Sequence, residues 1–366
     1  MIYFDYSANY PVKEEVIKYL YEVETNYYGN ANSVHELGKK SLSKYNSMDS
    51  HIKKMLGLLD SSEIVYTSSA TESNNLAIKG VARAYEGFGK HILVSPYEHS
   101  SVNGALGQLK DEGYTIDFIK LDKNGKIDLA SLDSQIKSDT ILVITMLVES
   151  ETGLINDVSA IADIVKRHPN CHHLVDATQG ITKIDVDLNK LELVSFTPHK
   201  FGGLIGTGCL IKKKSTILYP LINGGKSSSI YRAGSIPLGL IASIEKSIEL
   251  SLKNKEIDYN YVKGLQEYLL LNIKKEPNIL VNSFDYPYIV NLSIKDKKAS
   301  VVCDYLNQNG VCVSAKSACS ISSTPSKTIM AIYNNKARAF QSFRISLSSL
   351  TTKEEIDILL NLLRSV

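Results

Sequence analysis

Two stretches, HLVDATQ (His173–Gln179) and SFTPHK (Ser195–Lys200), decide how this chain folds. Each begins as an apolar run that is typical of a strand and ends abruptly in polar and ionisable residues. If the two runs are neighbouring parallel strands, Asp176 and Lys200 emerge at the same edge of one sheet. That edge is where ligands bind in open α/β folds. The pair therefore predicts either a binding site or a salt bridge at the strand ends.

A carboxylate and an amine at such an edge suit pyridoxal phosphate (PLP). This cofactor takes a lysine for its Schiff base and an acid that holds its ring nitrogen protonated. A structural ion pair is the alternative, because folds also bring the same two residue types together without any cofactor. For an isolated Asp and Lys the ion pair is the stronger interpretation, so the remaining motifs have to decide.

The same strand pattern recurs on both sides of the pair. Apolar runs alternate with amphipathic stretches from about residue 13 to 250, which predicts a mostly parallel sheet covered by helices. The expected strands are EIVYTSS, HILVSP, TIDFIKL, TILVITMLV, HHLVDA, LELVSFT and TGCLIKK. One long helix is expected around 238–275, and the pattern beyond it predicts a smaller α+β domain. We predict a large domain over 13–250 and a small one made of 1–12 and 251–366.

The composition limits the class of protein. The chain has 366 residues, of which 43% are hydrophobic and 22% charged, as expected for a globular enzyme with two domains. Its net charge of +2 is dispersed and gives no reason to expect nucleic acid or a membrane surface as partner. No apolar run approaches the roughly 20 residues that span a bilayer. The N-terminus lacks the pattern of a signal peptide. Five scattered cysteines without a CxxC pair support neither disulfides nor a metal site, so a reducing cytoplasm is expected.

Several polar motifs follow the expected strands. TSSATESNN (Thr67–Asn75) opens a helix whose first amides would bind a phosphate, or it is an ordinary capping box. His99 follows HILVSP, where an imidazole can stack on a planar ring or move protons; a loop histidine is the alternative. Gln179 either donates to a phenolic oxygen or caps the next helix. NGGKSSSIYRAGS (Asn223–Ser235) is typical of an anion-binding loop and equally of a flexible surface loop.

Two further residues suggest covalent chemistry and carboxylate binding. Cys319 lies in SAKSACSISSTPS, a small and polar segment without apolar periodicity, where a cysteine can act as a nucleophile. Arg344 interrupts the strand pattern of SFRISLS. An inward arginine there would bind a carboxylate through two hydrogen bonds, whereas an outward one would be an ordinary exposed strand residue.

Together these segments resemble the cysteine desulfurases, a branch of the class V PLP-dependent aminotransferase family with fold type I. The resemblance covers nearly the whole chain, in order and at suitable spacing. The matching segments are YFDYSANYPV, GNANSVHELG, TSSATESNNLAIKG, YEHSSV, VDATQG, SFTPHKFGG, YRAGS, SAKSACS and FRISLS. The resemblance implies an α/β large domain with a mostly parallel seven-stranded sheet and a smaller α+β domain.

The resemblance also implies how the cofactor is held. Lys200 would form the Schiff base with PLP, Asp176 would pair with the ring nitrogen, and His99 would stack on the ring and take part in catalysis. The other implied cofactor contacts are Ala70, Thr71, Ser150, Gln179, Thr197, His199 and Ser235.

Substrate and partners follow from the same resemblance. Arg344 and Asn30 would bind the substrate L-cysteine, and Cys319 would take its sulfur as a persulfide, leaving L-alanine. Ser235 matches a phosphate ligand that comes from the partner subunit, which implies a homodimer with shared active sites. A sulfur-acceptor protein is a further implied partner, with iron–sulfur cluster assembly as the associated process. No metal ligands are implied.

The chain departs from the family pattern at places that bear on substrate and turnover. Ser150 stands where the family has an asparagine beside the cofactor, and the family's glycine-rich loop is reduced to GGKSSS. Two other interpretations therefore stay open. One is another fold type I enzyme, such as a selenocysteine lyase or an aminotransferase. The other is a non-catalytic paralogue that binds partners.

Overall fold

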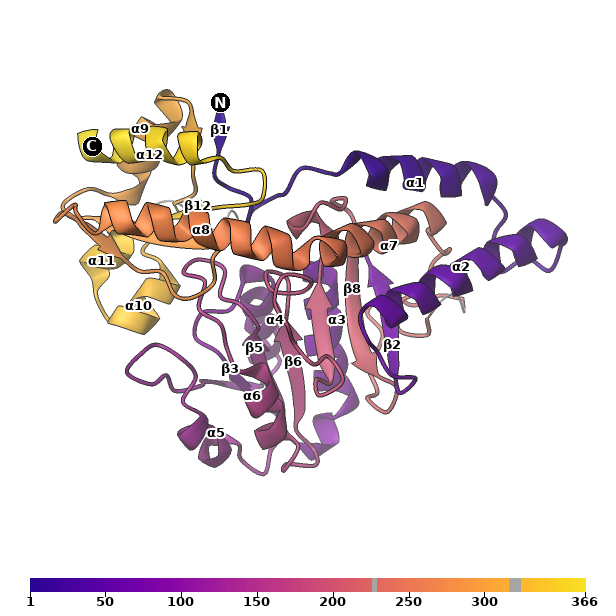
Figure 1. Ribbon diagram of the computed structural model, residues 1–366. Helices are drawn as coiled ribbons and strands as arrows, with labels where there is room; N and C mark the ends of the chain where they lie inside the picture. Colours follow the sequence, from indigo (N-terminus) through magenta and orange to yellow (C-terminus); the bar gives the residue numbers. More distant parts are fainter. Residues whose placement is uncertain (226–228, 316–323) are drawn as a thin grey trace.

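A seven-stranded sheet forms the centre of the molecule in the computed structural model, which describes residues 1–225, 229–315 and 324–366 (Figure 1). The strands lie in the order β2-β8-β7-β6-β5-β3-β4. Their bounds are β2 Ser62–Thr67, β3 His91–Val94, β4 Thr115–Phe118, β5 Thr140–Met146, β6 His172–Asp176, β7 Leu193–Phe196 and β8 Gly208–Lys213. Strands β4, β3, β5, β6 and β7 pair in parallel, whereas β8 runs antiparallel to β2 and β7. The predicted mostly parallel sheet is confirmed.

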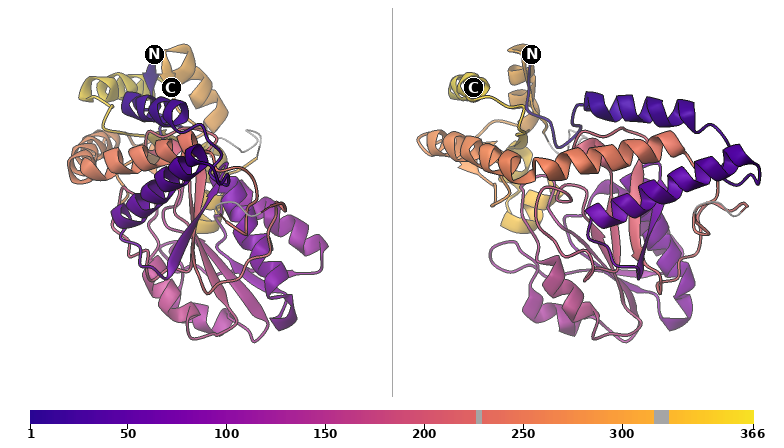
Figure 2. Two further views of the ribbon diagram at one scale, coloured as in Figure 1. Left: turned by 90° about the vertical axis from the view of Figure 1, so that its right-hand side faces the viewer. Right: turned by 45° about the vertical axis from the view of Figure 1, so that its right-hand side comes forward.

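Helices cover both faces of this sheet (Figure 2). Alternate residues of each strand point to opposite faces. Leu193 and Leu210 join the cluster packed under α3 (Ala70–Ala84) and α4 (Ser100–Asp111). Their neighbours Val194 and Ile211 instead belong to the cluster that contains α7 (Leu238–Lys253). Because both faces are buried, the strands read as nearly continuous apolar runs.

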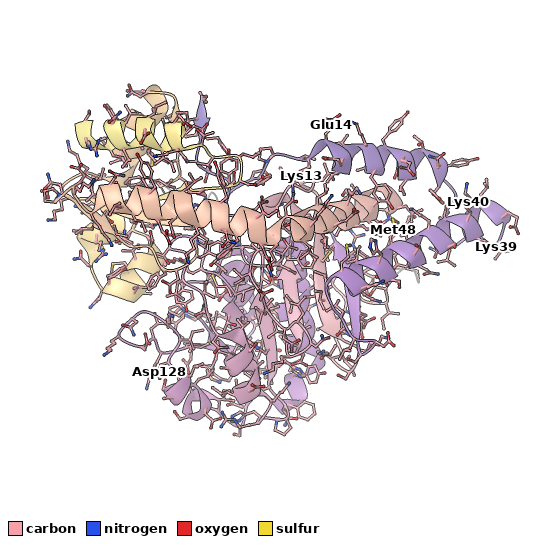
Figure 3. All side chains as sticks on the ribbon, in the orientation of Figure 1. Lys13, Glu14, Lys39, Lys40, Met48 and Asp128 are labelled. Carbon is pink, nitrogen blue, oxygen red and sulfur yellow. The ribbon has the colours of Figure 1, made fainter. Side chains whose placement is uncertain are left out.

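Two N-terminal helices lie along α7 and extend beyond the body of the molecule (Figure 1). They are α1 (Glu14–Asn26) and α2 (Glu36–Met55). Met48 of α2 is only 1% exposed and packs into the core, whereas Lys39 and Lys40 project from its far end (Figure 3). Helices α5 (Leu129–Gln135) and α6 (Val158–Val165) complete the layers around the sheet.

The C-terminal part forms a second, smaller unit together with the N-terminal strand. Its antiparallel sheet has the order β12-β10-β9, and β1 pairs in parallel with β11. The bounds of its elements are β1 Ile2–Tyr3, α8 Lys255–Ile273, β9 Ile279–Val281, β10 Ile289–Ile294, α9 Ala299–Gln308, β11 Val311–Cys312, α10 Lys327–Tyr333, α11 Lys336–Gln341, β12 Ser342–Ser346 and α12 Lys353–Ser365. Two short 3-10 helices, η1 Glu86–Phe88 and η2 Pro198–Lys200, lie in the larger unit. The domain boundaries at 12/13 and 250/251 stay a prediction.

The prediction of a single helix around 238–275 is wrong. The structure has two helices, α7 and α8, which meet at Asn254. Asn254 has φ −106° and ψ 4°, and its amide bonds back to the carbonyl of Leu252. Asparagine competes with helical hydrogen bonding through local side-chain and backbone contacts, so it is a frequent point of interruption. The apolar periodicity continues across the break, which is why the sequence did not reveal it.

Truncation of a central strand residue is expected to cost much more stability than truncation at the surface. Ile144 on β5 is 0% exposed, so Ile144→Ala is expected to lower the free energy of unfolding by about 2–5 kcal/mol. The control Ile257→Ala changes a residue of α8 that is 72% exposed, and a change within about 0.5 kcal/mol is expected. Denaturant unfolding of both variants measures this, and equal losses would contradict the placement of β5.

Candidate active site

A cavity of about 220 Å³ opens where β6 and β7 end. Asp176 is the last residue of β6, and Lys200 is the last residue of η2, which follows β7. Both line the cavity, as the strand pattern predicted. Its other lining residues are Ser7, Ala8, Ser69, Ala70, Thr71, His99, Met146, Val148, Ser150, Thr178, Gln179, Thr197, His199 and Arg344.

Three predicted site residues are not among those that line the cavity. Asn30 lies exposed in the loop before α2, where its side-chain oxygen accepts from the amide of Asn32 at 2.9 Å. Ser235 is exposed in the segment before α7. Cys319 lies outside the described residues. Their roles in the site therefore stay predictions.

Asp176 is held by hydrogen bonds from neighbouring elements. Asn74 on α3 is completely buried, and its Nδ2 donates to Asp176 Oδ2 at 2.9 Å. The other carboxylate oxygen accepts from the amide of Thr178 at 3.0 Å. Ser195, opposite Asp176 in the β6–β7 register, donates from its hydroxyl to Asn74 Oδ1 at 2.5 Å. The carboxylate is thus fixed in orientation, as a partner for a ring nitrogen requires.

The same asparagine connects Asp176 with His99. Asn74 Nδ2 also donates to Ser101 Oγ at 2.9 Å, and Ser101 Oγ lies 2.9 Å from His99 Nδ1. The amide of Ser101 donates to that ring nitrogen at 3.1 Å, so His99 caps α4. Burial lowers the pKa of His99; the charge of Asp176 raises it and that of Lys200 lowers it further. A neutral ring held in this way suits stacking on a planar ligand.

Lys200 points across the cavity toward the N-terminal segment. Its Nζ donates to the carbonyl oxygen of Ala8 at 2.6 Å. The carboxylate of Asp176 is instead bonded by Asn74 and by the amide of Thr178. Burial, and then Lys200, lower the pKa of the neighbouring His199 to about 4. The amine and the carboxylate thus both face one cavity.

The start of α3 provides amide donors at the edge of the cavity. Ser69 is the N-cap, its Oγ accepting from the amide of Glu72 at 3.1 Å, and Glu72 accepts in turn from the amide of Ser68. The amides of Ala70 and Thr71 belong to the first turn, which has no acceptors within its own helix. Such a helix start favours an anion. The predicted capping box and the predicted phosphate site are therefore compatible.

A close approach of β8 fixes this helix start. A Cβ on Gly208 would lie 2.4 Å from the carbonyl carbon of Ser69, so no larger residue fits there without a shift. Next to it, Thr197 donates from its hydroxyl to the carbonyl of Thr207 at 2.7 Å and lies 2.8 Å from His199 Nδ1. The predicted phosphate-binding residues of α3 and β7 thus face the cavity from adjoining elements.

Arg344 enters the cavity from the smaller unit. It lies on β12, is 1% exposed, and its Nη2 pairs with Asp5 Oδ1 at 2.8 Å. Its Nη1 donates to the carbonyl of Ser150 at 2.9 Å. The inward orientation is established, which excludes the ordinary exposed strand arginine. Buried arginine forks of this kind are suited to carboxylate binding.

Glu98, directly before His99, carries the most perturbed carboxyl next to the site. Its Oε1 accepts from Ser95 Oγ at 2.5 Å, and Oε2 is buried without a protein partner among the described residues. Burial raises the pKa of Glu98 to about 8, with smaller contributions from the charges of Asp176 and Glu149. The carboxyl is therefore neutral at pH 7.

The cavity has polar groups that fit PLP. Thr178 Oγ1, Gln179 Oε1 and Arg344 Nε are buried without a hydrogen-bond partner among the described residues, and all three residues line it. Buried polar atoms in folded proteins are nearly always paired, so a polar ligand is expected here. Asp176 and Lys200 provide the acid and the amine that PLP needs. The start of α3 provides amide donors suited to its phosphate.

Sequence reasoning missed several residues that shape this site. Asn74 lies in the quoted TESNN, but nothing in the sequence tells that α3 brings it to Asp176. Thr178 lies between Asp176 and Gln179, but no pattern in the sequence distinguishes its hydroxyl as part of the cavity. Ser7 and Ala8 contact Gln179 and Lys200 through backbone carbonyls, which leave no side-chain signal.

Comparisons with known proteins agree with this geometry. The family model described as aminotransferase class-V matches residues 2–359. A protein of Buchnera aphidicola subsp. Acyrthosiphon pisum named cysteine desulfurase IscS is 36% identical, covering 97% of this chain and 90% of that protein. A solved NifS-like protein superposes with a TM-score of 0.91 at 27% identity, covering 100% of this chain and 98% of the other. A structure titled SspA in complex with cysteine superposes with a TM-score of 0.81 at 27% identity, covering 95% of this chain and 99% of the other.

The fold and the cavity are those of a PLP-dependent enzyme of fold type I. The chain belongs to the class V aminotransferase family. Its cofactor is PLP, and the residues present fit that group.

A pH series tests the neutral state of Glu98. The folded state keeps this proton up to about pH 8, whereas the unfolded chain loses it near 4.5. Between these values the folded state binds more protons, so stability falls as the pH rises. Glu98→Gln cannot titrate, so its Tm is expected to fall less than that of the parent between pH 5.5 and 8.5. The exposed control Glu112→Gln is expected to follow the parent, and three parallel Tm profiles would refute the prediction.

Proposed function

We propose that this protein is a cysteine desulfurase, which converts L-cysteine to L-alanine and transfers the sulfur to Cys319 as a persulfide. One observation carries the proposal: the inward guanidinium of Arg344 lines the same cavity as Lys200 and Asp176. An amino acid bound through its carboxylate at Arg344 presents its amino group and α-carbon to the lysine side of the cavity. Relatives named cysteine desulfurase, and a cysteine complex of a similar structure, support this choice of amino acid.

The residues that line the cavity have different roles in cofactor binding and proton transfer. PLP, when bound, supplies an electron sink for the bonds of the substrate's α-carbon. Lys200 holds the cofactor in the resting enzyme, and its freed amine moves the α-proton of the substrate. Asp176, fixed by Asn74, holds the proton on the ring nitrogen. His99 would stack on the ring, and Ser150 and Gln179, which line the same cavity, would lie beside it.

Cys319 would complete the reaction as the nucleophile. Its thiolate attacks the substrate sulfur, the carbon–sulfur bond breaks, and the carbon gains a proton to become the methyl group of alanine. The backbone of Ser314 pairs with that of Arg344 in both directions, at 3.1 and 2.7 Å. Five further residues reach at most about 18 Å. The chain that carries Cys319 therefore starts at the substrate-binding arginine.

We further propose a homodimer in a reducing compartment, the cytoplasm. Ser235 is exposed and so accessible to a partner subunit. Ile222 and Ile230, which precede it in the chain, are 43% and 68% exposed, and exposed apolar side chains favour association.

The four described cysteines are free thiols. No helix in the described part of the chain is both long and apolar enough to cross a bilayer. A sulfur-acceptor protein would take the persulfide sulfur.

Substitution of the nucleophile tests the proposed reaction. Cys319→Ser is expected to abolish sulfide release from L-cysteine in the presence of a thiol reductant, because no persulfide can form. The control Cys303→Ser, a partly buried cysteine of α9, is expected to keep the parent rate. Lys200→Ala is expected to lose both the visible absorbance of the bound cofactor and the activity. Parent-rate sulfide release by Cys319→Ser would disprove the persulfide route. Turnover of selenocysteine or of a keto acid alone would favour the alternative enzymes, and a lack of turnover would favour the non-catalytic paralogue.

Substitution of the arginine tests carboxylate binding. Arg344→Lys keeps the charge but loses the forked geometry, so KM for L-cysteine is expected to rise about tenfold or more, with a smaller effect on kcat. The control Arg167→Lys changes a largely exposed residue that does not line the cavity, and it is expected to leave KM unchanged. Steady-state kinetics measures both constants. An unchanged KM in Arg344→Lys would remove Arg344 from the substrate site.

A further inference from the structure

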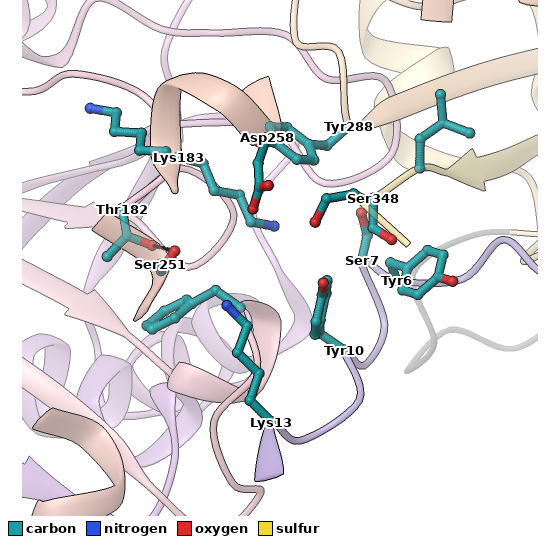
Figure 4. A pocket seen from close by; sticks show the side chains of 14 residues that line it. Tyr6, Ser7, Tyr10, Lys13, Thr182, Lys183, Ser251, Asp258, Tyr288 and Ser348 are labelled. Atoms are coloured by element: carbon teal, nitrogen blue, oxygen red, sulfur yellow. Dashed lines mark hydrogen bonds between the residues drawn. The ribbon is translucent and has the colours of Figure 1, made fainter. Parts of the chain in front are cut away.

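A second pocket lies between the N-terminal segment and Lys183 (Figure 4). It is enclosed by the N-terminal segment, the connection between β6 and β7, the start of α8 and the loop after β12. Ser7 lines both this pocket and the active-site cavity, so the two adjoin at the N-terminal segment. The family assignment and the proposed reaction give this pocket no role.

Lys183 enters this pocket without a carboxylate partner within ion-pair distance among the described residues. Its Nζ lies 4.9 Å from the centre of the Tyr288 ring, the one contact recorded for its ammonium in the described chain. Burial and, to a smaller extent, the charges of Lys200 and Lys13 lower the pKa of Lys183 to about 7. A lysine buried with this little compensation is costly to the fold unless it serves a ligand.

Lys13 brings a second ammonium group to the same pocket. A Cβ on Gly202 would lie 3.0 Å from Lys13 Cε and Cγ, so the lysine stem packs on the turn that follows Lys200. Gly202 has φ +96°, and its carbonyl accepts from the amide of Lys13 at 3.1 Å. Burial lowers the pKa of Lys13 as well, which shows that the stem is tucked into the fold. Two like charges held in one pocket call for an anion between them.

The residue before Lys183, Thr182, has a strained backbone conformation. Thr182 has φ 64°, which is rare for a β-branched residue, and its hydroxyl lies 2.8 Å from Ser251 Oγ of α7 (Figure 4). Strain of this kind persists where surrounding contacts enforce it, often at functional positions. Hydroxyl groups add neutral donors to the pocket. They belong to Ser7, Tyr10, Ser251, Ser348 and Ser349.

The other charged and titratable groups around the pocket leave its positive charge in excess. Asp258 is its one carboxylate within the described lining, and it makes no ion pair with either lysine. Lys255, also in the lining, pairs with Asp185. The charges of Asp258 and of Glu15 on α1 act on Lys13 and oppose the lowering of its pKa by burial. The remaining titratable groups that face the two lysines are Tyr6, Tyr10, Tyr288 and Lys200. Burial raises the pKa of the three tyrosines, so they stay neutral donors near pH 7.

We propose that this pocket is a binding site for one small inorganic oxyanion, held by the ammonium groups of Lys183 and Lys13 and by the surrounding hydroxyls. The cavity volume of about 30 Å³ limits the ligand to a group of this size, since about 10–15 Å³ already holds one water. A bound anion offsets positive charge close to Lys200 and fixes the segment whose Ala8 carbonyl accepts from that lysine. The site thereby couples anion concentration to the active-site amine.

Sulfate is the probe for this site because it stays a dianion across the working pH range. Isothermal titration of the PLP-loaded protein in a zwitterionic buffer is expected to show one saturable sulfate site per chain. The dissociation constant is expected to rise as the pH goes from 6 to 8, because Lys183 loses its proton through about 7 and no longer attracts the anion. The loaded protein is used so that its phosphate site is already filled.

Variants decide whether the lysines form the site. Lys183→Met and Lys13→Met are each expected to weaken sulfate binding about tenfold or more, the value of a hydrogen bond to a charged group. Lys183→Arg keeps the charge and is expected to retain binding, which separates a binding role from a packing role. The control Lys110→Met, an exposed lysine of α4, is expected to bind like the parent. Circular dichroism and Tm confirm that each variant is folded.

Two outcomes would overturn the proposal. One is the absence of saturable heat with the parent protein at millimolar sulfate. The other is equal binding by parent and Lys183→Met, which would make Lys183 a neutral amine packed on Tyr288. Because the readout is binding and not turnover, failure of the anion site is distinguishable from failure of the desulfurase proposal.

Discussion

The parallel pairing of β6 with β7 is the constraint on which the site depends. Its register places Asp176 opposite Ser195, and Ser195 then bonds to Asn74, which holds the Asp176 carboxylate. A shift of one residue would turn the side chains of β7 to the other face of the sheet. Ser195 would then leave Asn74, and Lys200 would leave the cavity. Burial of alternating apolar residues under α3 and α7 is what fixes this register, so the packing of the core determines the catalytic geometry.

The sheet could be predicted from the sequence because each strand is a local apolar run that ends in polar residues. All seven apolar runs contain strands of the sheet, and three of the predicted residues that end or follow them, His99, Asp176 and Lys200, line one cavity. The long helix over 238–275 failed because one asparagine interrupts it without breaking its apolar period. Asn74 was missed since its role depends on a tertiary contact across α3. Ser7 and Ala8 act through carbonyls, which every residue carries.

The short N-terminal segment, residues 5–10, makes hydrogen bonds to both units of the chain. Asp5 pairs with Arg344 of the smaller unit, whereas Ala8 accepts from Lys200 of the larger one. The carbonyl of Ser7 accepts from Gln179, and Tyr10 donates its amide to the carbonyl of His199. A few residues therefore set the spacing between Arg344 and Lys200. That spacing has to match the distance between the two ends of a bound amino acid.

Charge around the cavity is arranged so that ionisable groups of one sign do not collect at one point. Asp176 is hydrogen-bonded by the buried amide of Asn74. Glu98, whose pKa also responds to the charge of Asp176, is neutral because burial and that charge raise its pKa to about 8. Two carboxylates this close would otherwise repel each other in a medium of low dielectric constant. On the lysine side the same argument applies to Lys200 and Lys183, since burial and the charge of Lys200 bring the pKa of Lys183 down to about 7. A positive charge on Lys200 thus disfavours a proton on Lys183, as expected for two like charges separated by a medium of low dielectric constant.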